Sequence, residues 1–229
     1  MAAMSLVKGS AKDHTADFES LRSAMVRGQI FLRGLRDPRL LEAMGAVPRH
    51  LFVPEESAWS AYDDRPLPIG EGQTISQPFM VAAMTAALEL TGNERVLEVG
   101  TGCGYQAAIL ALLAREVHTI ESRARLAEDA AQRLAELDYA NVRVHTGDGT
   151  LGWPPAAPYD AILVSAAAPA IPAPLLEQLS AGGRLVIPVG DSAQQELWRV
   201  RQGSGTHEVL HYCRFVPLVG RHGWPGSSF

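Results

Sequence analysis

The sequence is poor in cysteine and has no excess of basic charge. Its 229 residues include two cysteines, Cys103 and Cys213, and 20 Lys and Arg against 25 Asp and Glu, for a net charge of −5. Two cysteines cannot form the disulfide framework of a small secreted protein, so a reducing, cytoplasmic location is expected. Since no cluster of Lys and Arg marks a contact with phosphates, nucleic acid is not expected as a partner.

Long apolar runs are also missing. The most apolar stretch, 161–176, is interrupted by Pro169, Pro172 and Pro174, and the first residues hold no continuous apolar segment. A transmembrane helix needs about 20 consecutive apolar residues, so neither a membrane span nor a signal peptide is expected. The apolar content of 47% is instead spread along the chain, which is typical of one large domain with a sizeable core.

The first part of the chain predicts helices around a loop. Residues 1–17 are mostly small and polar and predict a disordered tail, whereas residues 18–229 predict a single domain. Asp37 followed by Pro38 is a strong signal for the start of a helix. Within the N-terminal region, 18–92, the pattern predicts helices over 18–32, 38–44 and 79–90, an extended segment over 47–54 and a loop over 63–72.

From residue 93 onward, apolar β-rich runs alternate with helical patterns. This alternation predicts a parallel sheet with helices on both faces, and the turn 203–205 predicts an antiparallel hairpin at the C-terminal end. We therefore expect a doubly wound, Rossmann-like α/β fold with the N-terminal helices packed alongside, in which residues 93–219 form the core and the hairpin. In such sheets ligands bind at the carboxyl ends of the strands. The expected strands are 96–99, 117–121, 142–145, 159–164, 184–189, 196–201 and 209–215, and the expected helices are 105–114, 123–137 and 172–180.

Three glycines at alternate positions follow the first of these strands. Gly100, Gly102 and Gly104 precede a helix, where residues without a Cβ let the backbone approach a ligand closely. The spacing is G-x-G-x-G rather than the G-x-G-x-x-G of dinucleotide-binding proteins, and Glu98 lies where it would repel a pyrophosphate. The pattern resembles the first motif of S-adenosylmethionine-dependent methyltransferases, whose ligand carries a sulfonium cation. A tight turn without a ligand is the alternative.

Two carboxylates end the next two strands. Glu121 follows the glycine loop by about 20 residues, the spacing at which a carboxylate holds ribose hydroxyls. Asp148 lies between Gly147 and Gly149, where it is placed to accept the adenine amino group. A solvated strand-end acid and a simple β-turn are the respective alternatives. The small residues 165–168, after the fourth strand, leave room for a ligand and its target.

Six motifs together closely resemble the protein-L-isoaspartate O-methyltransferase family. They keep the family's order from about residue 18 to residue 219, and the Thr-Ile-Ser segment at 74–76 distinguishes this family from other methyltransferases. The motifs are 47–49, Gln73-Thr74-Ile75-Ser76-Gln77-Pro78, 100–104, 147–149, 185–190 and 214–219.

The resemblance implies roles for particular residues. Ser76 matches the family's essential serine, which would orient the substrate carboxylate, although by itself such a serine is more often a helix N-cap. Ile187 and Val189 match the substrate-facing strand of the family. The expected cofactor contacts are Gln73, Thr74, Ile75, Glu98, Gly100, Thr101, Gly102, Gly104, Glu121, Asp148 and Gly149.

The implied reaction transfers a methyl group from S-adenosylmethionine to the free α-carboxylate of isoaspartyl residues in damaged proteins and peptides. The products are S-adenosylhomocysteine and an ester that closes to a succinimide, which starts repair. A carboxylate with a pKa near 4 is already an anionic nucleophile at pH 7, so no general base is needed. No metal is expected, because the spacing of His207, His211 and Cys213 matches no strong metal site. A monomer is also expected. The alternatives are a methyltransferase of a small-molecule carboxylic acid and a non-catalytic cofactor-binding protein.

Overall fold

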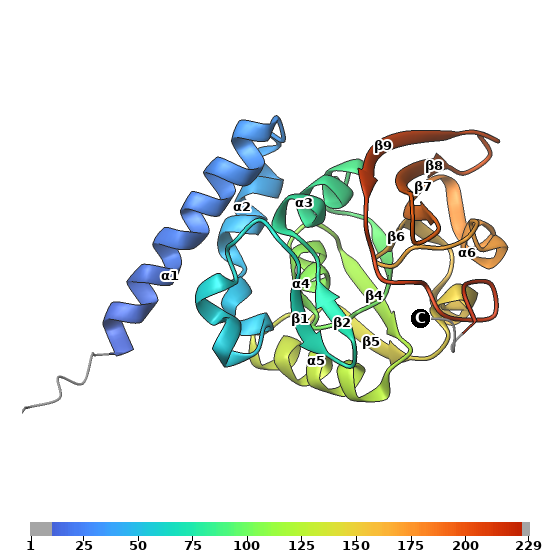
Figure 1. The fold of residues 1–229 in the computed structure, drawn as a ribbon. Helices are drawn as coiled ribbons and strands as arrows, with labels where there is room; N and C mark the ends of the chain where they lie inside the picture. The colour runs from blue at the N-terminus through green and yellow to red at the C-terminus, as the bar shows by residue number, and fades with distance from the viewer. Residues whose placement is uncertain (1–10, 226–229) are drawn as a thin grey trace, which may run out of the picture.

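The computed structural model describes residues 11–225 and shows an α/β fold (Figure 1). Within these residues a seven-stranded sheet has the strand order β5-β4-β3-β6-β7-β8-β9. The β5–β4, β4–β3, β3–β6 and β6–β7 pairs are parallel, whereas the β7–β8 and β8–β9 pairs are antiparallel. The predicted sheet with its C-terminal hairpin is therefore confirmed. The strands are β3 (Arg95–Val99), β4 (Glu116–Glu121), β5 (Val142–Thr146), β6 (Tyr159–Val164), β7 (Leu179–Gly190), β8 (Gln195–Arg201) and β9 (His207–Cys213).

The central strands are apolar on both faces because helices cover both. Successive side chains of a strand point to opposite faces. Val96 and Ala161 pack in one cluster with α3 and α4, whereas Leu97 and Ile162 pack in another with α6, and all four are fully buried. This double burial explains the near-continuous apolar runs of the predicted strands. The helices of this region are α3 (Pro78–Ala87), α4 (Tyr105–Ala111), α5 (Ala124–Glu136) and α6 (Ala173–Glu177).

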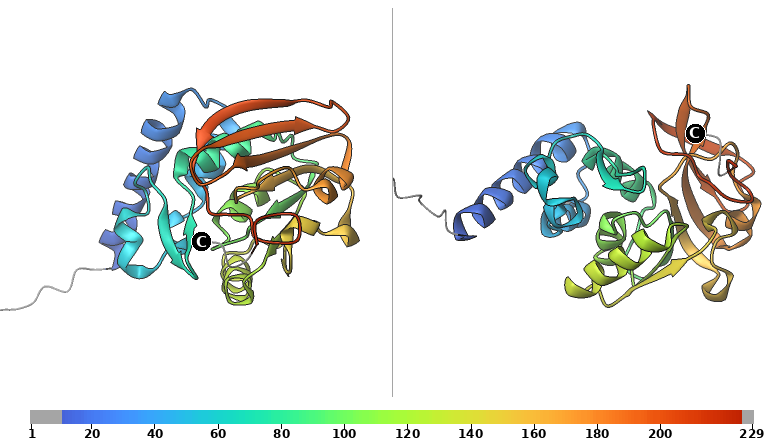
Figure 2. Two further views of the ribbon diagram at one scale, coloured as in Figure 1. Left: turned by 45° about the vertical axis from the view of Figure 1, so that its right-hand side comes forward. Right: turned by 60° about the horizontal axis from the view of Figure 1, so that its bottom comes forward.

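The N-terminal helices lie beside the sheet. Figure 2 shows α1 (Ala11–Met25) and α2 (Pro38–Ala46) on one side of the molecule and β7–β9 on the other. Asp37 is the N-cap of α2, and its side chain accepts a hydrogen bond from the Arg39 N–H at 2.9 Å, as predicted. No helix within residues 11–225 has the length and apolarity needed to cross a bilayer.

The first helix differs from its predicted bounds. α1 begins at Ala11 rather than at residue 18, so the stretch expected as a tail includes its first turns, while residues 1–10 lie outside the described part. After α1 the chain continues as a short π-helix, η1 (Val26–Ile30), and a 3₁₀ turn, η2 (Phe31–Arg33). Ile30, the last residue of η1, is buried in the core. The apolar pattern of the sequence does not reveal this change of helix type.

Two expected irregular stretches contain regular structure. The segment 47–54 was predicted as extended, but Pro48 starts a 3₁₀ turn, η3 (Arg49–Phe52). Side chains three residues apart lie on one side of such a turn, and Arg49 and Phe52 are both buried. The predicted loop 63–72 contains β1 (Leu67–Gly70), which pairs antiparallel with β2 (Gln73–Ile75). The remaining 3₁₀ segments are η4 (Glu55–Ser60), η5 (Gly149–Leu151) and η6 (Pro154–Ala156).

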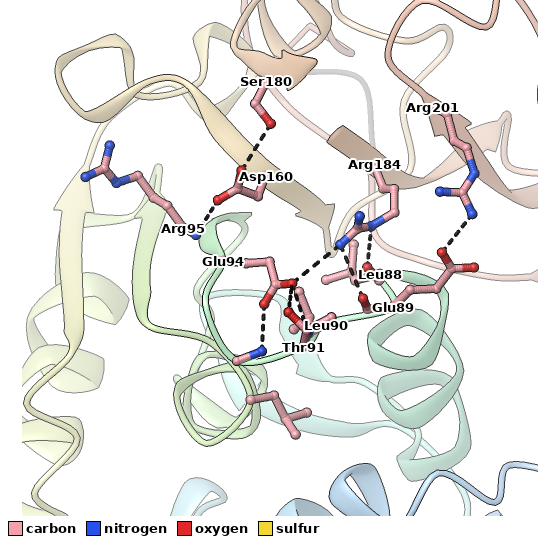
Figure 3. A network of polar contacts seen from close by, with 12 residues as sticks. Leu88, Glu89, Leu90, Thr91, Glu94, Arg95, Asp160, Ser180, Arg184 and Arg201 are labelled. Carbon is pink, nitrogen blue, oxygen red and sulfur yellow. Dashed lines mark hydrogen bonds and ion pairs between the residues drawn. The ribbon is translucent and has the colours of Figure 1, made fainter. Parts of the chain in front are cut away.

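A polar network occupies the edge of the sheet where β3 and β6 begin (Figure 3). The Asp160 carboxylate accepts hydrogen bonds from the Arg95 N–H at 2.8 Å and from the Ser180 hydroxyl at 3.1 Å. The Arg184 side chain donates to the Leu88 carbonyl after α3. These contacts fasten the amino ends of the strands.

Candidate active site

A cavity lies at the carboxyl ends of β3, β4 and β6. The space between its walls is about 780 Å³, including the part that is open to solvent. Its walls are the glycine loop after β3, the end of β4, the segment 73–76 and the C-terminal segment 216–219. Doubly wound sheets bind ligands at this edge, and here the cavity joins segments that are far apart in the sequence.

The glycines of the loop serve two purposes. Gly102 lines the cavity with a φ of +53°, in the left-handed region that side chains rarely adopt. Gly104 has a φ of +91° and is the N-cap of α4, and a Cβ there would lie 3.2 Å from the Leu134 side chain of α5. Gly104 therefore lets α4 and α5 pack closely. It does not line the cavity.

Glu121 joins the end of β4 to the glycine loop. Its side chain is buried and lines the cavity. Oε2 accepts a hydrogen bond from the Gly102 N–H at 2.9 Å, and Oε1 accepts one from the Arg123 N–H at 3.1 Å. The carboxylate thus fixes the shape of the loop at the same place where it faces the cavity.

Glu98 provides a buried carboxyl group in the cavity wall. One of its oxygens accepts a hydrogen bond from the Thr119 hydroxyl at 2.6 Å, and Thr119 is in turn 2.7 Å from the Thr101 hydroxyl. Oε1 is buried without a hydrogen-bond partner among the described residues. Burial raises the pKa of Glu98 to about 8, and the nearby charge of Glu121 adds to this shift. Such a group suits a cationic ligand, which would stabilise its ionised form, and not a phosphate.

Ser76 lies in the wall formed by the segment 73–76. The N-cap of α3 is Gln77, not Ser76, and no side chain caps this helix. Among the described residues the Ser76 hydroxyl makes no hydrogen bond, while the Ser76 carbonyl accepts one from Arg49 Nη2 at 2.7 Å. The backbone of Ser76 is therefore held, and its hydroxyl is available to a ligand in the cavity.

Asp148 holds the C-terminal segment. Oδ1 accepts hydrogen bonds from the Thr150 N–H at 2.9 Å and the Thr150 hydroxyl at 2.6 Å, and Oδ2 accepts one from the Arg221 N–H at 2.8 Å. Asp148 itself does not line the cavity, although Gly149 does. The carboxylate thus fastens the loop that follows residues 216–219, which form the cavity wall.

The structure brings most of the predicted site residues together. Gly104, Asp148, Ile187 and Val189 do not line the cavity, and Ile187 is fully buried in the hydrophobic core. The sequence assigned no role to Tyr105 and Gln106, which begin α4, although their place directly after the glycine loop was a signal. The predicted residues that do line the cavity are Gln73, Thr74, Ile75, Ser76, Glu98, Gly100, Thr101, Gly102, Glu121 and Gly149.

The fold and the cavity define an S-adenosylmethionine-dependent methyltransferase. A solved protein-L-isoaspartate O-methyltransferase matches 90% of this chain and 67% of its own length, with a TM-score of 0.78 and 26% identity. A structure of a putative protein-L-isoaspartate O-methyltransferase from Plasmodium falciparum, in complex with S-adenosyl-L-homocysteine, has a TM-score of 0.76 and 23% identity and shows the same fold. That match covers 86% of this chain and 98% of the other.

The chain belongs to the protein-L-isoaspartate O-methyltransferase family. The family model described as protein-L-isoaspartate(D-aspartate) O-methyltransferase matches residues 21–223. A relative of that name from Trichlorobacter lovleyi is 57% identical over 215 residues, which cover 93% of this chain and 99% of the relative. Protein-L-isoaspartate O-methyltransferase 1 from Syntrophobacter fumaroxidans is 55% identical over 212 residues, covering 92% and 99%. The predicted family and its cofactor, S-adenosylmethionine, are confirmed.

Proposed function

We propose that this chain methylates the free α-carboxylate of isoaspartyl residues in damaged proteins and peptides and so initiates their repair. The observation that carries the proposal is Ser76, which does not cap a helix and lines the same cavity as the glycine loop and Glu121. A methyltransferase of this family needs both a cofactor cradle and a group that orients a carboxylate, and both meet in this cavity.

The cofactor contacts are part of the proposal. The carboxyl group of Glu98 would face the cationic part of S-adenosylmethionine, and Glu121 would hold the ribose beside the Gly102 backbone. When bound, the cofactor supplies an electrophilic methyl group. The remaining requirement is alignment, because a carboxylate is ionised at neutral pH and acts as the nucleophile without a base.

Ser76 would supply that alignment. Its hydroxyl would donate a hydrogen bond to one carboxylate oxygen and leave the other directed at the methyl group. The wall 216–219 would exclude water, which competes for the same position. Asp148 would support this wall through Arg221, and Ile187 and Val189 would support the substrate through the strand β7.

The methyl ester is the product on which repair depends. The backbone nitrogen of the following residue attacks the ester carbonyl and expels methanol, which leaves a succinimide. Water then opens the ring on either side and returns isoaspartyl or normal aspartyl peptide, and we propose that neither step needs the enzyme.

Chromatography of a peptide incubated with the enzyme and cofactor tests this sequence of events. An isoaspartyl peptide should convert to its methyl ester, then to the succinimide, and over repeated cycles to the aspartyl form. The Ser76→Ala variant should give little ester at the same enzyme concentration. Absence of the ester with the wild-type enzyme would contradict the proposal.

We further propose that the chain acts as a monomer in the cytoplasm. The cavity is assembled from one chain, so no partner copy is needed to complete it. Within the described residues both cysteines are free, which suits a reducing compartment. Light scattering during gel filtration should give the mass of one chain.

A further inference from the structure

Arg49 is a charged residue buried directly behind Ser76. Its side chain is 0% exposed. Nε donates a hydrogen bond to the Ala61 carbonyl at 2.6 Å, and Nη2 donates one to the Ser76 carbonyl at 2.7 Å. The guanidinium therefore connects η3, the end of η4 and the Ser76 segment, which are separate in the sequence.

The charge of Arg49 has no counterion in the described part of the chain. No carboxylate forms an ion pair with it, and its electrostatic neighbours are Tyr105, Cys103 and Tyr62, which are neutral at pH 7. Its Cζ lies 4.8 Å from the centre of the Tyr105 ring, and desolvation lowers its pKa. An uncompensated buried charge is strongly unfavourable. A neutral amide can donate to the same carbonyls, so the hydrogen bonds alone do not explain a charged residue here.

The Ser76 segment is held from both sides. Arg49 binds the carbonyl of Ser76, and Asp64 accepts hydrogen bonds from the Gln77 side chain at 2.8 Å and from the Phe79 N–H at 3.3 Å. Ser76 thus lies between two fixed points and lines the cavity. A shift of the Arg49 contact would displace the backbone of Ser76 and, with it, the hydroxyl.

We propose that Arg49 is a positioning residue for methyl transfer, which fixes Ser76 through its carbonyl and whose charge complements the carboxylate of the substrate. The inference rests on the proposed function, because the anion that balances the charge is the α-carboxylate of the isoaspartyl residue. The two parts of the role are separable, since one depends on geometry and the other on charge.

Two variants separate the charge from the geometry. Arg49→Gln keeps amide donors and removes the charge, so it should raise the KM for an isoaspartyl peptide roughly tenfold with a smaller change in kcat. Arg49→Lys keeps the charge but cannot reach both carbonyls with a single amine, so it should lower kcat more than it raises KM. A peptide with an isoaspartyl α-carboxamide, used as a competitive inhibitor, should bind the wild type and Arg49→Gln equally well.

Arg39 provides the matched control. It is half-buried and, like Arg49, donates to two backbone carbonyls, those of Leu90 at 2.9 Å and Leu113 at 3.3 Å, but neither lines the cavity. Arg39→Gln should leave both kinetic constants near their wild-type values. S-adenosylmethionine affinity and the thermal midpoint, measured on each sample, establish that every variant is folded and binds its cofactor.

A double-mutant comparison tests whether Arg49 acts through Ser76. In a Ser76→Ala background, Arg49→Lys should cause no further loss of kcat, because the hydroxyl that it positions is absent. Independent losses in the two backgrounds, or equal KM effects from Arg49→Gln and Arg39→Gln, would overturn the inference. A wild-type enzyme that does not methylate isoaspartyl peptides would instead refute the proposed function, so the two failures are distinguishable.

Discussion

Glu121 Oε2 accepts a hydrogen bond from the Gly102 N–H at 2.9 Å, which couples the end of β4 to the loop after β3. The contact follows from the parallel register, in which Val99 is opposite Ile120, so that each strand ends beside the other. One carboxylate therefore shapes the glycine loop and lines the cavity that the loop surrounds. Loss of Glu121 should affect cofactor binding through both roles.

Glu121→Ala should weaken S-adenosylmethionine binding by roughly one to two powers of ten. A charge-assisted hydrogen bond contributes about 1.5–3 kcal/mol, which corresponds to that range. Glu121→Gln keeps an oxygen that can accept from Gly102 and should lose less. Calorimetry on the folded proteins measures both, and an unchanged affinity for the alanine variant would remove Glu121 from the cofactor site.

Ser76→Ala should abolish most methyl transfer with little effect on stability. Because Gln77 is the N-cap of α3 and the Ser76 hydroxyl makes no hydrogen bond to a described residue, the variant loses no capping interaction. A true N-cap serine would cost about 1 kcal/mol on replacement. Turnover and the thermal midpoint are measured on one sample. Near-normal turnover would show that the hydroxyl does not orient the carboxylate.

Glu98 should make stability decline with rising pH. Burial raises its pKa from the ordinary 4.5 to about 8, so the folded state favours the neutral form. The stabilisation is complete below pH 4.5 and is lost as the pH rises through 8. Relative to Glu98→Gln, the wild-type thermal midpoint without cofactor should therefore fall between pH 5 and pH 8. Parallel pH curves for the two proteins would contradict this assignment.

Gly220→Ala should weaken cofactor binding by displacing the cavity wall. A Cβ at Gly220 would overlap Oδ1 of Asp148, the residue that fastens this segment, and its φ is +156°. Gly203→Ala is the control, because Gly203 also has a positive φ, +79°, but has open space around the Cβ position. The control should lower the thermal midpoint and leave S-adenosylmethionine affinity unchanged. Equal affinities for both variants would show that the wall does not depend on Asp148.

The core of the fold was predictable because its strands are buried on both faces. Val96–Val99 and Tyr159–Val164 are near-continuous apolar runs, and the glycine loop follows directly from the first of them. Parallel strands end at one edge, so a local pattern sufficed to bring Gly102 and Glu121 together. The short pair β1–β2 was missed because its strands are three and four residues long and Gly70 and Gly72 resemble a loop.

Long-range contacts explain the parts of the site that were not predictable. The Asp148 carboxylate accepts a hydrogen bond from the backbone N–H of Arg221, which follows it by 73 residues in the sequence. Nothing in the sequence near Asp148 indicates this contact. Ile187 has the same local pattern whether it faces a substrate or the core, and only its packing against distant residues shows that its side chain is buried in the core. The buried position of Arg49 likewise depends on the fold of distant segments.

Labelled methyl transfer to a pair of otherwise identical peptides tests the central claim most directly. One peptide carries an isoaspartyl residue, which adds a methylene to the main chain and leaves the α-carboxylate free, and its twin carries normal aspartate. If Ser76 fixes the carboxylate relative to the neighbouring backbone, only the isoaspartyl peptide reaches the aligned position, and its twin should be essentially inert. Equal labelling of both peptides would contradict the account, as would labelling of neither while a small carboxylic acid is methylated.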